Sequence, residues 1–160
     1  MFFEDIPIGA TLELGEHIFT EEDMLRFARA YDPQDFHLSH EKAAQTHFGQ
    51  LCASGWHTAS VWMRKMVDTQ ARLANEAVAR GERPARIGPA PGFENLVWKR
   101  PVYAGDTIRF TSTVMSKRES RSRPQWGLLT QHNEGFNQHG ELVYAFDATI
   151  FVERRDAGKD

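Results

Sequence analysis

The stretch "ASGWHTASVWMRKMVDTQARLANEAVAR", from Ala53 to Arg80, decides the fold, because it contains no proline and no glycine after Gly55. Its apolar residues recur at spacings of three and four, which is typical of an amphipathic helix. They are Trp56, Ala59, Met63, Met66, Val67, Leu73, Ala74 and Ala77, with Gln70 in the same series. The pattern predicts one helix of about six to seven turns. Such a helix must cross most of a small domain.

Two shorter helices are expected before the long one. Thr20 precedes three acidic residues and can cap a helix, because its hydroxyl accepts from a free backbone N–H and acids favour the positive end of the helix dipole. That helix should end near Tyr31, since Asp32 precedes Pro33 and a residue before proline avoids helical angles. Ser39 can cap a second, short helix.

Strand patterns fill the second half of the chain, after the Pro- and Gly-rich connection at 81–92. The expected strands are "FENLVWKRPVY", "DTIRFTSTVMS", "WGLLTQHNEGF" and "ELVYAFDATIFVE". Between the last two, "NQHG" (Asn137 to Gly140) predicts a hairpin turn. A long helix followed by an antiparallel meander indicates an α+β domain with one face of the sheet covered by the helix. Because one helix is too narrow for a whole sheet, we expect a second copy of the chain to cover the remainder.

Length and composition limit the other possibilities. The chain has 160 residues, of which 41% are hydrophobic and 26% charged, so one domain with a real core is expected over residues 1–153. The remaining residues, 154–160, have nothing to bury and predict a flexible tail. The net charge of −3 and the absence of a long basic run argue against a nucleic-acid partner. The most basic stretch, "SKRESRSR" (Ser116 to Arg123), is interpreted as an exposed loop.

Nothing in the chain predicts a membrane partner or an oxidising compartment. No window approaches the roughly 20 apolar residues that a spanning helix needs. The opening residues, "MFFEDIPIGA", do not resemble a secretory signal. The single cysteine, Cys52, excludes an internal disulfide framework and is interpreted as a small buried thiol. We therefore expect a cytoplasmic protein.

The stretch "YDPQDFHLSHEKAA" (Tyr31 to Ala44) places Asp32 and His37 on a short, stiff loop between two helices. A carboxylate and an imidazole that face one water molecule could divide the roles of base and acid. Alternatively, Asp32 stabilises its own turn and His37 is a surface residue. From the spacing alone, this structural alternative is favoured.

A second candidate lies at the head of the long helix, at Ser54 and Gly55. The first N–H groups of a helix have no partner within it and lie at the positive end of its dipole, so they can stabilise a developing oxyanion. The alternative is that Ser54 only caps the helix and Gly55 only permits the turn. A zinc site is not expected, because the spacing of the histidines matches no common zinc signature.

Together these motifs resemble those of the MaoC-like dehydratases, the hotdog-fold group that includes the (R)-specific enoyl-CoA hydratases. The loop of that group has the form Asp-x-Asn/Gln-Pro-hydrophobic-His, with a small residue six positions later. Here it reads "DPQDFH" from Asp32 to His37, with Ala43 as the small residue and Asp35 in place of the proline. "GQLCASGWHT" is similar to the family's helix head, and "RPVYAGDTI" and "FEDIPIGA" resemble further family segments.

The resemblance implies a single hotdog domain, with a long central helix wrapped by an antiparallel sheet, that assembles as a homodimer or a higher even-numbered oligomer. It also implies reversible addition of water to a trans-2-enoyl-CoA thioester, with the CoA thioester as substrate and no separate cofactor. Asp32 would take a proton from water and His37 would deliver one to C2. The N–H of Gly55 would hold the thioester oxygen, with Ser54, Trp56 and His57 around it.

Two other functions remain open on the same fold. A hotdog thioesterase would need an acid on the central helix near the substrate, but the acids there, Asp68 and Glu76, lie far from Gly55 in the sequence. A non-catalytic subunit that binds acyl thioesters needs no acid or base. Several relatives carry a serine eight positions after the helix-head glycine, where this chain has Met63; Ser60 is the nearest hydroxyl.

Overall fold

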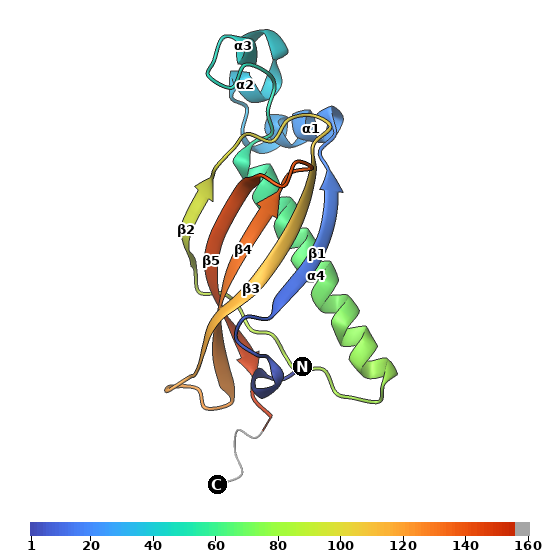
Figure 1. Ribbon diagram of the computed structural model, residues 1–160, viewed down its shortest axis with the longest axis vertical. Helices are drawn as coiled ribbons and strands as arrows, with labels where there is room; N and C mark the ends of the chain where they lie inside the picture. The colour runs from blue at the N-terminus through green and yellow to red at the C-terminus, as the bar shows by residue number, and fades with distance from the viewer. Residues whose placement is uncertain (156–160) are drawn as a thin grey trace.

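A computed structural model describes residues 1–155, in which one antiparallel sheet faces one long helix (Figure 1). The five strands lie in the order β1-β3-β4-β5-β2, and each neighbouring pair is antiparallel. Their bounds are β1 Thr11–Ile18, β2 Phe93–Trp98, β3 Thr107–Glu119, β4 Trp126–Phe136 and β5 Leu142–Glu153. The helices are η1 Phe3–Asp5, α1 Glu21–Tyr31, α2 Asp35–Leu38, α3 His40–Ala44 and α4 Gly55–Ala79. The predicted α+β architecture is confirmed.

The helix boundaries follow the capping residues of the sequence. The backbone N–H of Asp23 donates to Thr20 Oγ1 at 3.2 Å, and that of Lys42 donates to Ser39 Oγ at 3.3 Å. The first helix ends at Tyr31, as expected of a residue two positions before a proline. Its last turn therefore delivers Asp32 directly into the loop that leads to α2.

The core lies between α4 and the inner face of the sheet. From α4, Trp62 and Met66 are buried, and they face Tyr144 and Phe146 of β5. Burial of such large side chains contributes roughly 1.5–3 kcal/mol each. The helix is 25 residues long, so its two ends lie near opposite ends of the sheet (Figure 1).

Strand β1 is not predicted from the sequence. It lies at one edge of the sheet and pairs with β3, but a bulge between Glu13 and Gly15 interrupts the pairing. Gly15 adopts a φ of 91°, a left-handed conformation that glycine reaches without steric cost. Because the bulge shifts which side chains face the core, the strand has no regular alternation of apolar and polar residues.

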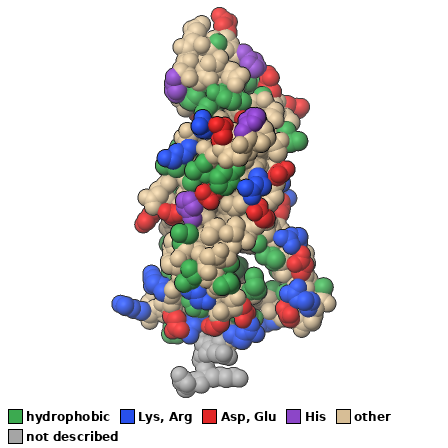
Figure 2. All heavy atoms as spheres, viewed as in Figure 1, with side chains coloured by type: hydrophobic (Ala, Val, Ile, Leu, Met, Phe, Trp, Pro, Cys, Tyr) green, Lys and Arg blue, Asp and Glu red, His purple; other side chains and the backbone are tan. Residues whose placement is uncertain are grey.

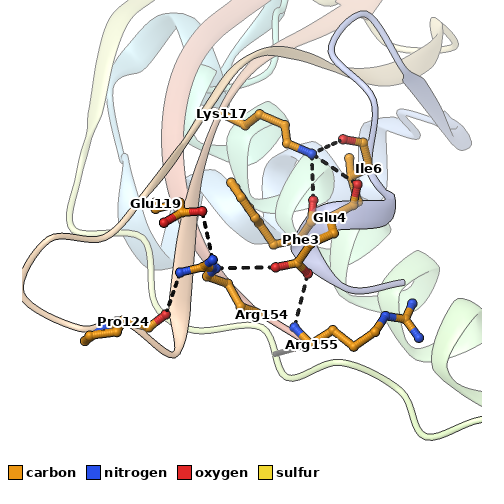
Figure 3. Close-up of polar contacts among 8 residues, drawn as sticks. All are labelled: Phe3, Glu4, Ile6, Lys117, Glu119, Pro124, Arg154 and Arg155. Carbon is orange, nitrogen blue, oxygen red and sulfur yellow. Dashed lines mark hydrogen bonds and ion pairs between the residues drawn. The ribbon is translucent and has the colours of Figure 1, made fainter. Parts of the chain in front are cut away.

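The expectation of an exposed loop over Ser116 to Arg123 is wrong in its first half, since β3 extends to Glu119. Lys117 lies on this strand and its ammonium group donates to the carbonyl oxygens of Phe3 and Ile6, both at 2.8 Å (Figure 3). The same nitrogen lies 4.7 Å from the centre of the Phe3 ring. Lys117 thus fastens the N-terminal segment to the sheet.

Beyond β5, Arg154 and Arg155 both contact Glu4, the former by an ion pair and the latter through its backbone N–H (Figure 3). Of the tail expected at 154–160, residues 156–160 lie outside the described part of the chain. Within residues 1–155, no helix has the length and apolar character needed to cross a membrane.

Candidate active site

The loop that carries Asp32 and His37 lies at the end of the molecule where α4 begins. Helices α1, α2 and α3 gather there, beyond the end of the sheet (Figure 1). Asp32 follows α1 directly, and His37 lies in the single turn of α2. The two residues are thus carried by separate helical segments joined through Pro33, which gives the loop its stiffness.

The structure brings the carboxylate and the imidazole together. Asp32 Oδ2 lies 3.4 Å from His37 Nε2, and both side chains are largely buried. The same oxygen accepts a hydrogen bond from Ser54 Oγ at 2.7 Å, and Oδ1 accepts one from Gln34 Nε2 at 2.7 Å. Burial raises the pKa of Asp32, but these two hydrogen bonds and the nearby His37 outweigh it, so the net pKa is lowered. Asp32 is therefore held as a carboxylate.

The tautomer of His37 follows from its second partner. Its Nδ1 lies 2.8 Å from the backbone carbonyl oxygen of Cys52, and a carbonyl oxygen can only accept. Nδ1 therefore carries a hydrogen, and Nε2 is the nitrogen that faces Asp32. His37 as a whole is 6% exposed, so the orientation of its ring is set by packing as well as by this bond.

Gly55 is the first residue of α4, and no group among residues 1–155 accepts from its N–H. It lines a cleft of about 540 Å³ together with both members of the Asp–His pair. A methyl group added to Gly55 would lie 2.4 Å from Cε2 of Trp98. Only glycine leaves room for the indole and a ligand at this helix end.

Comparison with known proteins identifies the family. A family model described as "MaoC like domain" matches residues 5–132. The chain belongs to this MaoC-like family. A MaoC-like dehydratase from Rhodospirillum rubrum is 33% identical, with a TM-score of 0.83 over 98% of this chain and 99% of that one. The described fold is accordingly the hotdog fold.

Two curated proteins are also similar in sequence. The uncharacterized protein YdeM of Bacillus subtilis is 23% identical over 154 residues, which cover 96% of this chain and all of YdeM. The mesaconyl-CoA hydratase of Haloarcula marismortui is 35% identical over 66 residues, which cover 41% of this chain. Those residues span only 18% of that hydratase.

In this MaoC-like protein, Ser54 has a role that the sequence did not predict. Its hydroxyl accepts from the N–H of Trp56 at 3.2 Å, as a helix cap does, and at the same time donates to Asp32. Ser54 therefore ties the carboxylate to the head of α4. Trp56, by contrast, lines the cleft and is half-exposed.

His57 does not lie in the cleft, contrary to the expectation that it belongs to the substrate pocket. Its ring stacks on Phe27 of α1, with the ring centres 4.8 Å apart, and meets Phe19 edge-on. Burial, together with the positive charges around it, lowers the pKa of His57 to about 4. Side chains of α4 point in different directions at successive positions, so Gly55 and His57 cannot be assigned to one pocket from proximity in the sequence.

Other cleft residues were missed by sequence reasoning. The carbonyl of Cys52 orients His37, and no sequence signal marks a backbone acceptor. Burial and the charge of Asp32 raise the pKa of the Cys52 thiol to about 11, which disfavours the reactive thiolate. Lys99 and Arg100 line the same cleft and suit an anionic part of a ligand.

The hydroxyl of Ser60 does not reach the cleft, because it donates to the carbonyl oxygen of Trp56 at 2.8 Å. Met63, at the position where several relatives carry serine, is 53% exposed. Neither residue supplies a hydroxyl to the Asp–His pair. Among residues 1–155, no cluster of three or more His, Cys, Asp or Glu side chains could hold a metal ion.

Proposed function

We propose that this MaoC-like protein is a hydratase that adds water reversibly across the double bond of a trans-2-enoyl-CoA thioester. The observation that carries the proposal is the convergence of Asp32, His37 and the free N–H of Gly55 in one cleft. A base, an acid and an oxyanion donor are the three groups that such an addition requires.

In the direction of hydration, a water molecule binds within hydrogen-bond reach of both Asp32 Oδ2 and His37 Nε2, which lie 3.4 Å apart. Asp32 accepts one proton from this water as its oxygen forms a bond to C3 of the substrate. As this bond forms, the electrons of the C2–C3 double bond move toward the thioester carbonyl. C2 of the resulting enolate then takes a proton from His37 Nε2, which carries this proton in addition to the hydrogen on Nδ1 in the reactive form of the enzyme. Transfer of the proton from Asp32 to His37 then restores both groups, so the net change is the addition of one water molecule.

The thioester oxygen gains negative charge while C3 is attacked, because the electrons of the double bond move toward the carbonyl group. At the head of α4, this oxygen can accept from the N–H of Gly55 and meet the positive end of a helix dipole. Removal of one such donor typically costs about 10²–10³ in kcat. The stiff loop also contributes to the rate, since it holds Asp32 and His37 in a productive geometry.

The family and the partial likeness to mesaconyl-CoA hydratase support hydratase chemistry. The two acids on α4 do not support thioesterase chemistry. Asp68 forms an exposed ion pair with Arg64, and Glu76 forms one with Arg72, so neither acid faces the cleft. A non-catalytic subunit would not need the hydrogen bonds that hold Asp32 ionised.

A spectroscopic assay tests the proposal. Purified protein is mixed with crotonyl-CoA, loss of the absorbance of the conjugated thioester is followed, and free thiol is measured in parallel. Loss of absorbance without thiol release is the expected result. Release of thiol would indicate a thioesterase, and no change with linear, branched and dicarboxylic enoyl-CoA substrates would leave only a binding role.

We also propose that a second copy of the chain packs against β2 and α4. Strand β2 is an edge of the sheet and offers unpaired backbone groups. Trp98 at the end of this strand and Met63 and Val67 on α4 expose 44%, 53% and 51% of their surfaces. Pairing of two β2 edges would cover these apolar side chains and extend the sheet across a two-fold axis.

A further inference from the structure

The face of α4 that packs on the sheet carries residues four positions apart, which lie above one another along a helix. Thr58 lines the active-site cleft, whereas Met66 and Gln70 line a second cavity of about 300 Å³. Between them along the helix comes Trp62, which lines neither cavity and is 6% exposed. Trp62 therefore lies at the boundary between the two cavities.

Strand β5, which faces α4, shows the same succession along its length: a residue of the active-site cleft, then an aromatic residue, then residues of the second cavity. Val143 lines the active-site cleft, and Ile150 and Val152 line the second cavity. Phe146 lies between these positions, and its ring meets that of Trp62 edge-on with the centres 4.6 Å apart. The paired rings of Trp62 and Phe146 thus lie between the residues that line the two cavities, on the helix side and on the sheet side.

The second cavity is mainly apolar and lies between the C-terminal half of α4 and the sheet. Figure 1 shows this half of the helix diverging from the strands, and Figure 2 shows a hollow with hydrophobic side chains beside it. Its apolar lining includes Leu12, Met66, Leu73, Val114, Leu129 and Ile150. A site with this lining and an elongated position along α4 suits a hydrocarbon chain.

The indole of Trp62 is held by packing rather than by hydrogen bonding. Its Nε1 is buried and has no partner among residues 1–155, although a buried tryptophan usually finds one. Gly55 and Trp62 are seven residues apart, which places them about 10 Å apart along the helix axis. An acyl chain whose thioester oxygen is held at Gly55 therefore meets the indole after a short distance.

We propose that Trp62 determines substrate specificity by closing the route from the active-site cleft to the second cavity, so that only short enoyl chains are accepted. This inference rests on the proposed hydratase function. Loss of the indole would join the two cavities into one channel that accommodates a longer acyl chain.

The test compares crotonyl-CoA with trans-2-decenoyl-CoA as substrates of the full-length protein and of Trp62→Ala. The wild-type protein should strongly prefer crotonyl-CoA, and Trp62→Ala should raise kcat/KM for decenoyl-CoA relative to crotonyl-CoA by about tenfold or more. Trp62→Leu, which keeps more of the core contacts, serves if Trp62→Ala does not fold. The matched control is Val78→Ala, an exposed position on the same helix that should leave the preference unchanged.

Equal activity of the wild-type protein on both substrates would overturn the inference, as would a folded Trp62 variant with no gain on decenoyl-CoA. If the wild-type protein hydrates neither of these substrates nor a branched or dicarboxylic enoyl-CoA, the proposed function fails. Binding of decanoyl-CoA, measured by calorimetry, then tests separately whether Trp62 closes the route to the second cavity. Binding at least about tenfold tighter to the Trp62 variant would support it. Equal affinity of both proteins would overturn it.

Discussion

Ser54 Oγ donates a 2.7 Å hydrogen bond to Asp32 Oδ2 and accepts one from the N–H of Trp56 at 3.2 Å. The residue that caps the long helix is therefore also the residue that orients the carboxylate. Through Ser54, this arrangement holds Asp32 near the positive end of α4. The Ser54 hydrogen bond, together with that from Gln34 and the nearby His37, lowers the pKa of Asp32 although burial raises it.

Replacement of Ser54 tests this connection. Because the hydrogen bond favours ionised Asp32, Ser54→Ala should raise the pKa of the carboxyl group and move the acid limb of the pH profile of kcat/KM to higher pH. Loss of the cap should also lower the free energy of unfolding by about 1 kcal/mol. Ser54→Thr, which keeps the hydroxyl, should retain the wild-type profile. An unchanged profile in Ser54→Ala would show that the hydrogen bond does not tune Asp32.

The acid and the base should each be essential. Asp32→Asn and His37→Gln should lower kcat about a hundredfold or more, since each removes one proton-transfer group and leaves its shape nearly intact. Asp35→Asn is the matched control, because this exposed acid lies on the same loop and pairs with Lys42 rather than facing the cleft. A loss of less than about tenfold in either site variant would count against the assignment.

His57 should make the fold sensitive to mild acid. Its pKa is lowered from 6.5 to about 4 in the folded chain, so the unfolded chain binds more protons between these pH values. His57 does not lower the free energy of unfolding above pH 6.5. As the pH drops from 6.5 toward 4, the unfavourable burial of this histidine lowers that free energy by on the order of 3 kcal/mol. His57→Phe should reduce this dependence in urea unfolding measured across that range. A wild-type slope in the variant would assign the effect to another group.

Glu153 should make the stability of the fold depend on pH in a lower range than His57 does. Arg83 donates to its carboxylate, which is also held by Arg86, and its pKa is lowered from 4.5 to about 2 despite the opposing effect of burial. Its contribution to stability is therefore present above pH 4.5 and is lost as the pH falls toward 2. Glu153→Gln should lower the free energy of unfolding at neutral pH. It should also weaken the dependence of that free energy on pH between 2 and 4.5, measured by urea unfolding. Equal slopes for the two proteins would contradict the prediction.

The proposed assembly can be tested at Val67, which is exposed on α4 and is not a cleft residue. Val67→Glu would place a charge inside the expected interface, and burial of an unpaired charge is costly. Light scattering after size-exclusion chromatography should find an even-numbered oligomer for the wild-type chain and a shift toward monomer for the variant. Val78→Glu, near the far end of the helix, should not change the mass. A monomeric wild-type chain would refute the proposal.

Much of the fold could be predicted because its signals are local. The caps Thr20 and Ser39, the proline after Asp32 and the uninterrupted 3.6-residue period of α4 each act within a few residues of chain. Strand β1 could not be predicted, because the left-handed Gly15 breaks its alternation and only pairing with β3 makes it a strand.

The sequence by itself determined that this chain forms a long helix and an antiparallel sheet, and that Asp32 and His37 share one stiff loop. Tertiary structure alone decided which groups meet that loop: Ser54 lies 22 residues from Asp32, and the carbonyl of Cys52 lies 15 residues from His37. Tertiary structure also decided that His57 stacks on Phe27 of α1 and that Trp62 packs against Phe146. The physical reason is that local propensity acts through the backbone over a few residues, whereas these contacts depend on how α4 packs against elements far away in the chain.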